Sequence, residues 1–135
     1  MITVEEVLNS KQHQDLLTVE PDQTVQEALE IMAAHRVSSL PVLRGDSLVG
    51  IVSERDYIRK AVPRRVAPWD LKVREIMTEK VICVTRGDTV KECMRLMTSK
   101  GIRHLPVVNA GHLEDMVSIT DVMRVLVGSS PKVDL

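Results

Sequence analysis

Aromatic residues are almost absent from this chain, which has one Tyr, one Trp and no Phe among its 135 residues. The hydrophobic core must therefore be built from aliphatic side chains and from the seven methionines. Proteins that bind single-stranded nucleic acid stack successive bases on aromatic side chains. The composition argues against that class of protein.

The chain also has little net charge and no long apolar run. Its 18 basic and 19 acidic residues leave a formal net charge of −1, which argues against a broad electrostatic grip on DNA or on an anionic membrane. No apolar segment approaches the ~20 residues of a membrane-spanning helix, and the first residues lack the basic and apolar regions of a signal peptide. We therefore expect a cytoplasmic protein with no nucleic-acid or membrane partner.

Cysteine is scarce, and Cys83 and Cys93 are too few for a disulfide scaffold. The simplest interpretation makes them small buried apolar residues, while a redox-linked function of either thiol stays open. The histidines show no spacing typical of metal ligands, and no catalytic arrangement emerges that capping or core packing does not explain. We expect no metal and no catalytic residue. The histidines are His13, His35, His104 and His112.

An internal repeat organises the chain. When the sequence is shifted by 65 residues, residues 17–59 align with residues 82–124 without a gap, and thirteen of the 43 positions are identical. Chance would give roughly two or three identities, so the chain contains two copies of one unit.

Both copies predict the same order of elements, β-α-β-β-α. Thr24 and Thr89, each followed three residues later by Glu, begin a helix as capping boxes. Each helix then carries the apolar stripe of a core-facing helix. Pro41 and Pro106 lack an N–H and should lie at an edge or a bulge. The first copy has predicted strands at 16–19, 38–43 and 48–52 and helices from 25 and at 54–62; the second has strands at 81–84, 103–108 and 113–117 and helices from 90 and at 119–127.

The predicted fold class is α+β, with two tandem β-α-β-β-α units. One unit alone has too little core, so we expect the two to pack sheet to sheet with pseudo-two-fold symmetry and two equivalent clefts. The expected organisation is a first domain at 1–62, a linker at 63–72, a second domain at 73–128 and a flexible tail at 129–135.

In each copy a serine and an aspartate three residues apart stand where a strand becomes a helix: Ser53 with Asp56, and Ser118 with Asp121. This pattern is a helix-capping motif. It also suits a nucleotide, because a helix N-terminus offers free N–H groups to phosphate and a carboxylate offers two acceptor oxygens to two ribose hydroxyls. Both interpretations stay open and can hold together.

At this point the sequence resembles the cystathionine-β-synthase (CBS) domain pair, or Bateman module. The resemblance rests on HRVSSLPV at 35–42 with GIVSERDY at 50–57, and on GIRHLPVV at 101–108 with VSITD at 117–121. VREIMT at 73–78 resembles the opening of a second copy. The similarity spans about residues 3–127 and is greatest to the stand-alone bacterial pairs.

The resemblance implies clefts for AMP, ADP, ATP, NAD or S-adenosylmethionine. The motif aspartates would hold the ribose hydroxyls, and the motif serines would lie near ribose or phosphate. Residues just before Leu-Pro would line each cleft, and early strand residues of the opposite copy would close it. The implied ligand-binding residues are Ser38, Ser39, Ser53, Asp56, Thr78 and Ile82 for the first cleft, and Leu17, Thr18, Arg103, His104, Ser118 and Asp121 for the second.

One departure from the family pattern concerns Asp115, which stands where the first copy has Gly50. A carboxylate that points into the second cleft would repel a phosphate and impair that cleft. Against this, only the second copy has Arg103 and His104 to meet an anion.

The expected function is that of a non-catalytic regulatory module that binds an adenine nucleotide and signals energy state to a partner protein not identified by the sequence. The alternative is a purely structural dimerisation module with empty clefts. The resemblance also implies a homodimer, and the second helices carry the apolar surface that such contact needs. These residues are Tyr57, Ile58, Ala61, Val62, Val122, Met123, Leu126 and Val127.

Overall fold

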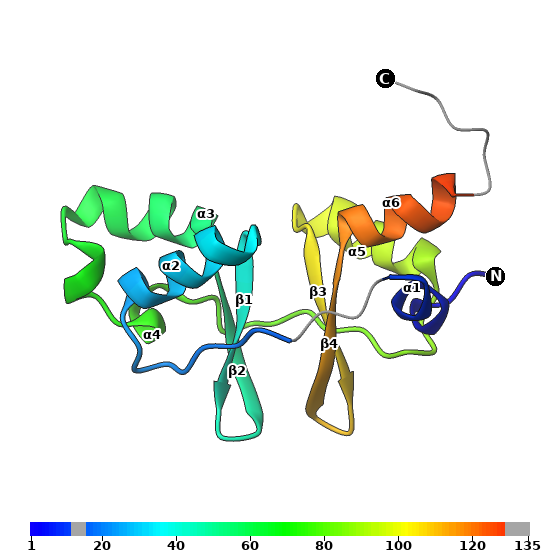
Figure 1. Ribbon diagram of the computed structural model, residues 1–135, viewed down its shortest axis with the longest axis horizontal. Coiled ribbons are helices and arrows are strands. Elements are labelled where there is room, and N and C mark those ends of the chain that lie inside the picture. Colours follow the sequence, from blue (N-terminus) through cyan, green and yellow to red (C-terminus); the bar gives the residue numbers. More distant parts are fainter. Residues whose placement is uncertain (12–15, 129–135) are drawn as a thin grey trace. The chain divides into compact units, whose positions relative to one another are not determined.

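The computed structural model describes residues 1–11 and 16–128, and the chain divides into two compact units (Figure 1). The central unit is Leu17–Val81, and the outer unit combines Met1–Leu16 with Ile82–Leu135. The predicted tail at 129–135 lies outside the described residues. The segment that precedes each repeat is grouped with the unit that contains the other repeat. The expected domain bounds of 1–62 and 73–128 stay a prediction.

Backbone hydrogen bonds explain this exchange of segments. In the outer unit Thr3 bridges Thr89, and the Val90 N–H donates to the Ile2 carbonyl at 2.9 Å. In the central unit Thr24 bridges Lys72 in the same way. Thr24 and Thr89 are equivalent in the repeat, so residues 3–11 and 72–80 are equivalent flanking segments, offset by 69 residues.

Beside its hairpin, the central unit has several helical elements, of which α2 (Val25–His35) is regular and the helix that follows the hairpin is not (Figure 1). The predicted helix at 54–62 begins as α-helix but continues as a π-helix, in which the Val62 N–H donates to the Tyr57 carbonyl. Pro63 follows directly and cannot continue an α-helical ladder. The elements are α2 (Val25–His35), β1 (Ser39–Arg44), β2 (Ser47–Ser53), α3 (Glu54–Asp56), η1 (Tyr57–Ala61), η2 (Val62–Arg64), η3 (Pro68–Asp70) and α4 (Val73–Ile76).

In the outer unit the helix that follows the hairpin is regular. The α6 helix keeps α-helical geometry throughout, and no proline follows it within the described residues. The elements are α1 (Val4–Ser10), α5 (Val90–Lys100), β3 (His104–Asn109), β4 (His112–Ser118) and α6 (Ile119–Val127). The α+β class is therefore confirmed.

Each hairpin lies within about one residue of its predicted bounds. The first predicted strand of each copy is reduced to a single parallel bridge, Val19 to Val42 and Val84 to Val107. The register shifts directly after Val42 and Val107, next to Pro41 and Pro106. Both prolines therefore lie beside a bulge, as expected from their missing N–H.

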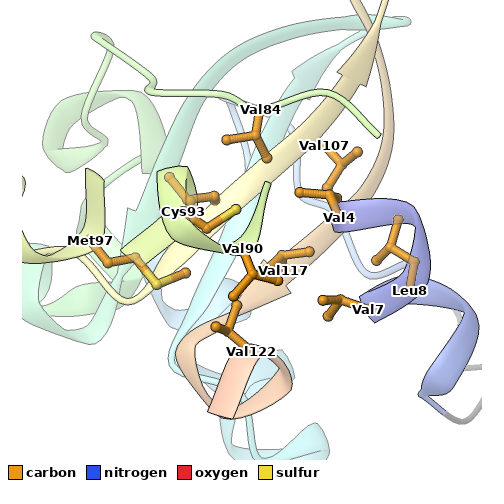
Figure 2. Close-up of a cluster of buried hydrophobic side chains, with 11 residues drawn as sticks. Val4, Val7, Leu8, Val84, Val90, Cys93, Met97, Val107, Val117 and Val122 are labelled. Atoms are coloured by element: carbon orange, nitrogen blue, oxygen red, sulfur yellow. The ribbon is translucent and has the colours of Figure 1, made fainter. Parts of the chain in front are cut away.

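Each unit has its own aliphatic core. In the outer unit Val4, Val7 and Leu8 of α1 pack with apolar residues of α5, β3, β4 and α6 (Figure 2). Burial of a Val or Leu side chain contributes ~1.5–3 kcal/mol, so α1 is a structural part of this core. The central core is formed in the same way by Val19, Val25, Ala28, Met32, Leu40, Val42, Val52, Ala61, Leu71, Val73 and Ile76.

Candidate functional site

The serine–aspartate motifs form capping boxes in both units. The Ser53 N–H donates to Asp56 Oδ2 at 2.9 Å, and the Asp56 N–H donates to Ser53 Oγ at 3.1 Å. The Ser118 N–H donates to Asp121 Oδ2 at 3.0 Å, and the Asp121 N–H donates to Ser118 Oγ at 3.1 Å. The capping interpretation is confirmed for both motifs.

The two carboxylate oxygens of each motif aspartate have different hydrogen-bond partners. In Asp56, Oδ2 holds the cap, while Oδ1 accepts from Thr78 Oγ1 at 3.1 Å and lies 3.1 Å from Lys60 Nζ. In Asp121, Oδ2 holds the cap and Oδ1 accepts from Arg124 Nη2 at 3.1 Å. The Lys60 and Arg124 side chains are 45% and 48% exposed, so these partners of Oδ1 can exchange for another donor.

Gly50 brings Thr78 to Asp56. The Ile51 and Thr78 backbones exchange hydrogen bonds of 3.0 and 2.8 Å beside it. A Cβ atom on Gly50 would lie 2.8 Å from Met77 Sδ and 3.0 Å from the Thr78 carbonyl oxygen. The absence of a side chain therefore lets the segment after α4 cross β2 closely enough to deliver the Thr78 hydroxyl.

Ser39 supplies a second feature of the central unit. It is only 8% exposed, and its Oγ has no hydrogen-bond partner within the described residues. Ser39 stands opposite Ser53 in the β1–β2 ladder, and directly opposed residues project from the same face of a sheet. We call Ser39, Ser53, Asp56 and Thr78 the central half-site.

Asp121 lies among cations in the outer unit. Lys11 Nζ is 3.6 Å from Asp121 Oδ2, and Arg124 lies on the other oxygen. Burial would raise the pKa of Asp121, but the Ser118 N–H, Lys11 and Arg124 outweigh burial, so that its pKa is lowered. The carboxylate is thus held ionised by its neighbours.

Asp115 does not stand free. Lys11 Nζ lies 3.3 Å from Asp115 Oδ1 and donates to the Met116 carbonyl at 2.9 Å. The Lys11 side chain is 18% exposed, so its ammonium is largely enclosed by these oxygens.

His104 takes the place of Ser39 in the outer unit, opposite Ser118 in the β3–β4 ladder. Burial lowers the pKa of His104, with a smaller contribution from Arg103, although Asp121 acts in the opposite direction. We call His104, Ser118 and Asp121, with Lys11 and Asp115, the outer half-site.

The family profile of the CBS domain matches residues 3–62 and 73–128. The chain belongs to the CBS domain family. It is 41% identical over 111 residues to the mitochondrial CBS domain-containing protein CBSX3 of Arabidopsis thaliana, which covers 78% of this chain and 54% of that relative. The chain thus spans about half the length of this curated relative.

Solved structures show the same similarity over the whole chain. A CBS-domain protein from Burkholderia ambifaria MC40-6 superposes with a TM-score of 0.93 at 36% identity, covering 98% of this chain and 99% of that one. CBSX2 in complex with AMP superposes with a TM-score of 0.82 at 25% identity, covering 97% and 100%.

The remaining predicted site residues lie in the CBS repeats as follows. Ser38 and Arg103 are exposed, and their carbonyls accept the first N–H of α3 and of α6. Leu17 packs against the central core and Ile82 against the outer core, while Thr18 is half-buried. Their placement in clefts that they share with the opposite repeat stays a prediction.

Sequence reasoning did not connect Lys11, Lys60 or Arg124 with the motif aspartates. The cations on the helices carry a signal that could have found them, because Lys60 follows Asp56 by four residues and Arg124 follows Asp121 by three. Lys11 carries no such signal, since it lies 104 residues from Asp115 in the sequence.

Within residues 1–11 and 16–128, no helix is long and apolar enough to cross a bilayer. Nor do three His, Cys, Asp or Glu side chains gather there as metal ligands would.

Proposed function

We propose that this CBS pair is a non-catalytic regulatory module that binds adenine nucleotides, of the AMP, ADP, ATP or NAD class, at the half-sites of its two repeats. Nucleotide occupancy would signal energy state to a partner protein. The observation that carries this proposal is the buried, unpartnered hydroxyl of Ser39 beside Ser53 and Asp56.

A buried hydroxyl without a partner costs ~1–3 kcal/mol of stability. Such an atom is explained if a ligand supplies the missing hydrogen bond. Ser39 lies on the face that also carries the Ser53 hydroxyl, which reaches Asp56 at 2.9 Å. Two neighbouring polar groups of this kind suit the hydroxyls of a ribose.

The motif aspartates fit the same ligand without losing their caps. Oδ2 of Asp56 and Asp121 remains with the capping serine, while Oδ1 faces side chains that are about half exposed. A ribose hydroxyl can replace Lys60 or Arg124 as the donor to Oδ1. The complex of CBSX2 with AMP supports adenosine monophosphate as the first ligand to test.

Calorimetric titration of AMP, ATP and NAD tests the proposal. Asp56→Asn and Asp121→Asn keep the side-chain volume and remove the charge, and each should weaken binding at its own half-site only. Loss of a charge-assisted hydrogen bond in a desolvated site costs about 1.5–3 kcal/mol, or roughly ten- to a hundredfold in affinity. If the aspartates only cap helices, both variants will be less stable while nucleotide binding stays as in the wild type. If no nucleotide binds the wild type, the regulatory function is contradicted.

A structural dimerisation module is the second candidate function, and exposed apolar side chains on the second helices favour it. Met123, Leu126 and Val127 of α6 are 43, 42 and 53% exposed, and Ile58 and Val62 are 62 and 53% exposed. Light scattering should give the mass of a dimer at micromolar concentration. A dimer that binds no adenine nucleotide would support this function alone.

A further inference from the structure

Asp115 sets the outer half-site apart from the central one. It occupies in β4 the position that Gly50 occupies in β2, and it adds a carboxylate close to Asp121. Lys11 lies against both, 3.3 Å from Asp115 Oδ1 and 3.6 Å from Asp121 Oδ2. Two carboxylates therefore share one enclosed ammonium, and Arg124 supplies the second positive charge at 3.1 Å.

Lys11 also replaces a backbone contact of the central unit. There, the Thr78 N–H donates to the Ile51 carbonyl at 2.8 Å, because Gly50 has no side chain in the way. In the outer unit the equivalent carbonyl, that of Met116, accepts from Lys11 Nζ at 2.9 Å. The Lys11 side chain thus donates to the same backbone position in the outer unit that the Thr78 N–H reaches in the central unit.

We propose that Lys11 is a specificity-determining residue of the outer half-site, where its ammonium neutralises Asp115 so that the phosphate of an adenine nucleotide is not repelled. The inference rests on the proposed function and explains how the outer half-site tolerates a carboxylate that the central half-site lacks. Lys11 and Asp115 act as a pair, so that the lysine is needed only while the aspartate is present.

The geometry argues that Lys11 does not block the site by occupying the oxygen that the ligand would bind. Lys11 Nζ is closer to Asp115 than to Asp121, and on Asp121 it approaches Oδ2, the oxygen that holds the cap. Oδ1 is left to Arg124, whose side chain is 48% exposed. Lys11 can therefore remain in place when a ribose hydroxyl takes over Oδ1.

A double-mutant cycle tests the pair, with AMP and adenosine as probes in calorimetric titrations of the full chain. The outer half-site is identified as the binding event that Asp121→Asn weakens. Lys11→Met should weaken AMP binding there roughly tenfold, because an uncompensated carboxylate repels the phosphate through a partly screened interaction. Adenosine has no phosphate, so its affinity should change by less than about twofold. The Lys11→Met/Asp115→Asn double variant should recover AMP affinity to within about threefold of the wild type.

Matched variants control for charge and for folding. Lys80 is the counterpart of Lys11 in the other flanking segment and is exposed, so Lys80→Met removes the same charge and should leave AMP affinity unchanged. Lys11→Arg keeps the charge and should bind AMP like the wild type. Lys11→Gln keeps a donor for Met116 and replaces Lys11→Met if that variant fails to fold.

Several outcomes would overturn the inference. AMP affinity that is unchanged or higher in Lys11→Met would show that Lys11 is idle or blocks the site. Equal losses for AMP and adenosine, or a double variant as weak as Lys11→Met, would show that Lys11 acts through the fold or on the ligand directly. A wild type that binds no AMP contradicts the proposed function and the inference together, whereas binding that depends on Asp121 but not on Lys11 contradicts the inference alone.

Discussion

Ser39 and Ser53 stand opposite each other in the β1–β2 ladder, yet they differ in how their hydroxyls are satisfied. Ser53 Oγ donates to Asp56 Oδ2 at 2.9 Å, whereas Ser39 Oγ is buried without a hydrogen-bond partner in residues 1–11 and 16–128. The pair combines a satisfied group and an orphaned group on one face. This arrangement gives Ser39 opposite predicted effects on stability and on binding.

Replacement of Ser39 by Ala should stabilise the ligand-free protein by ~1 kcal/mol, because it removes an unsatisfied buried hydroxyl. The same variant should bind AMP less tightly, since the hydrogen bond to the ligand is lost. Urea unfolding and calorimetry measure the two effects. Ser47→Ala is the matched control because Ser47 is exposed at the start of β2, and it should change neither quantity. A Ser39→Ala protein that binds AMP as well as the wild type would remove the main support for the proposed function.

Gly50→Ala should lower the free energy of unfolding by ~1–3 kcal/mol, as expected for overpacking. Its Cβ would meet Met77 Sδ at 2.8 Å, which can move, but also the Thr78 carbonyl oxygen at 3.0 Å, which belongs to the backbone. Displacement of this segment should also detach Thr78 from Asp56 and weaken nucleotide binding in the central half-site. Gly87→Ala is the control, because its Cβ would meet nothing within 4 Å. Equal stability of the two variants would contradict the crowding argument.

Acidification should destabilise the outer unit through His104. Burial holds the pKa of His104 below 6.5 in the folded state, so the unfolded chain binds its proton first. The stability that His104 contributes is complete above pH 6.5 and is lost as the pH falls through the folded pKa, with a slope of at most about 1.4 kcal/mol per pH unit. Denaturant unfolding between pH 5 and 8 should show this slope in the wild type and a flatter profile in His104→Gln. His112 is exposed, and a His112→Gln profile that is equally flat would refute the assignment.

Native thiol labelling should leave Cys93 unmodified at neutral pH. Cys93 is fully buried, and desolvation, with the charges of Asp88 and Glu92, raises its pKa to about 11. The thiolate is the reactive form, and burial raises the pKa of Cys83 as well. Labelling of Cys93 as fast as in urea-unfolded protein would return the redox hypothesis to consideration.

Much of the fold was predictable because its signals are local. The Thr24 and Thr89 helix starts and the Ser-x-x-Asp caps each depend on residues within one turn of helix, and the structure contains all of them. Likewise the hairpin strands were predicted to within about one residue from short strand runs that flank a polar turn. The α+β class followed from the order of these elements.

The tertiary structure alone decided the rest, because it depends on residues far apart in the chain. The predicted strands at 16–19 and 81–84 each form a single parallel bridge, at Val19 and at Val84. The segment before each repeat joins the other unit through backbone bonds that leave no trace in the local pattern. The sequence by itself determined that Asp115 stands at the repeat position of Gly50, but not whether the Asp115 carboxylate has an ion-pair partner. Only the fold brings Lys11 to Asp115, which lies 104 residues away in the sequence. The partner of a charged residue on a flanking segment is set by tertiary contacts, so the local sequence does not reveal it.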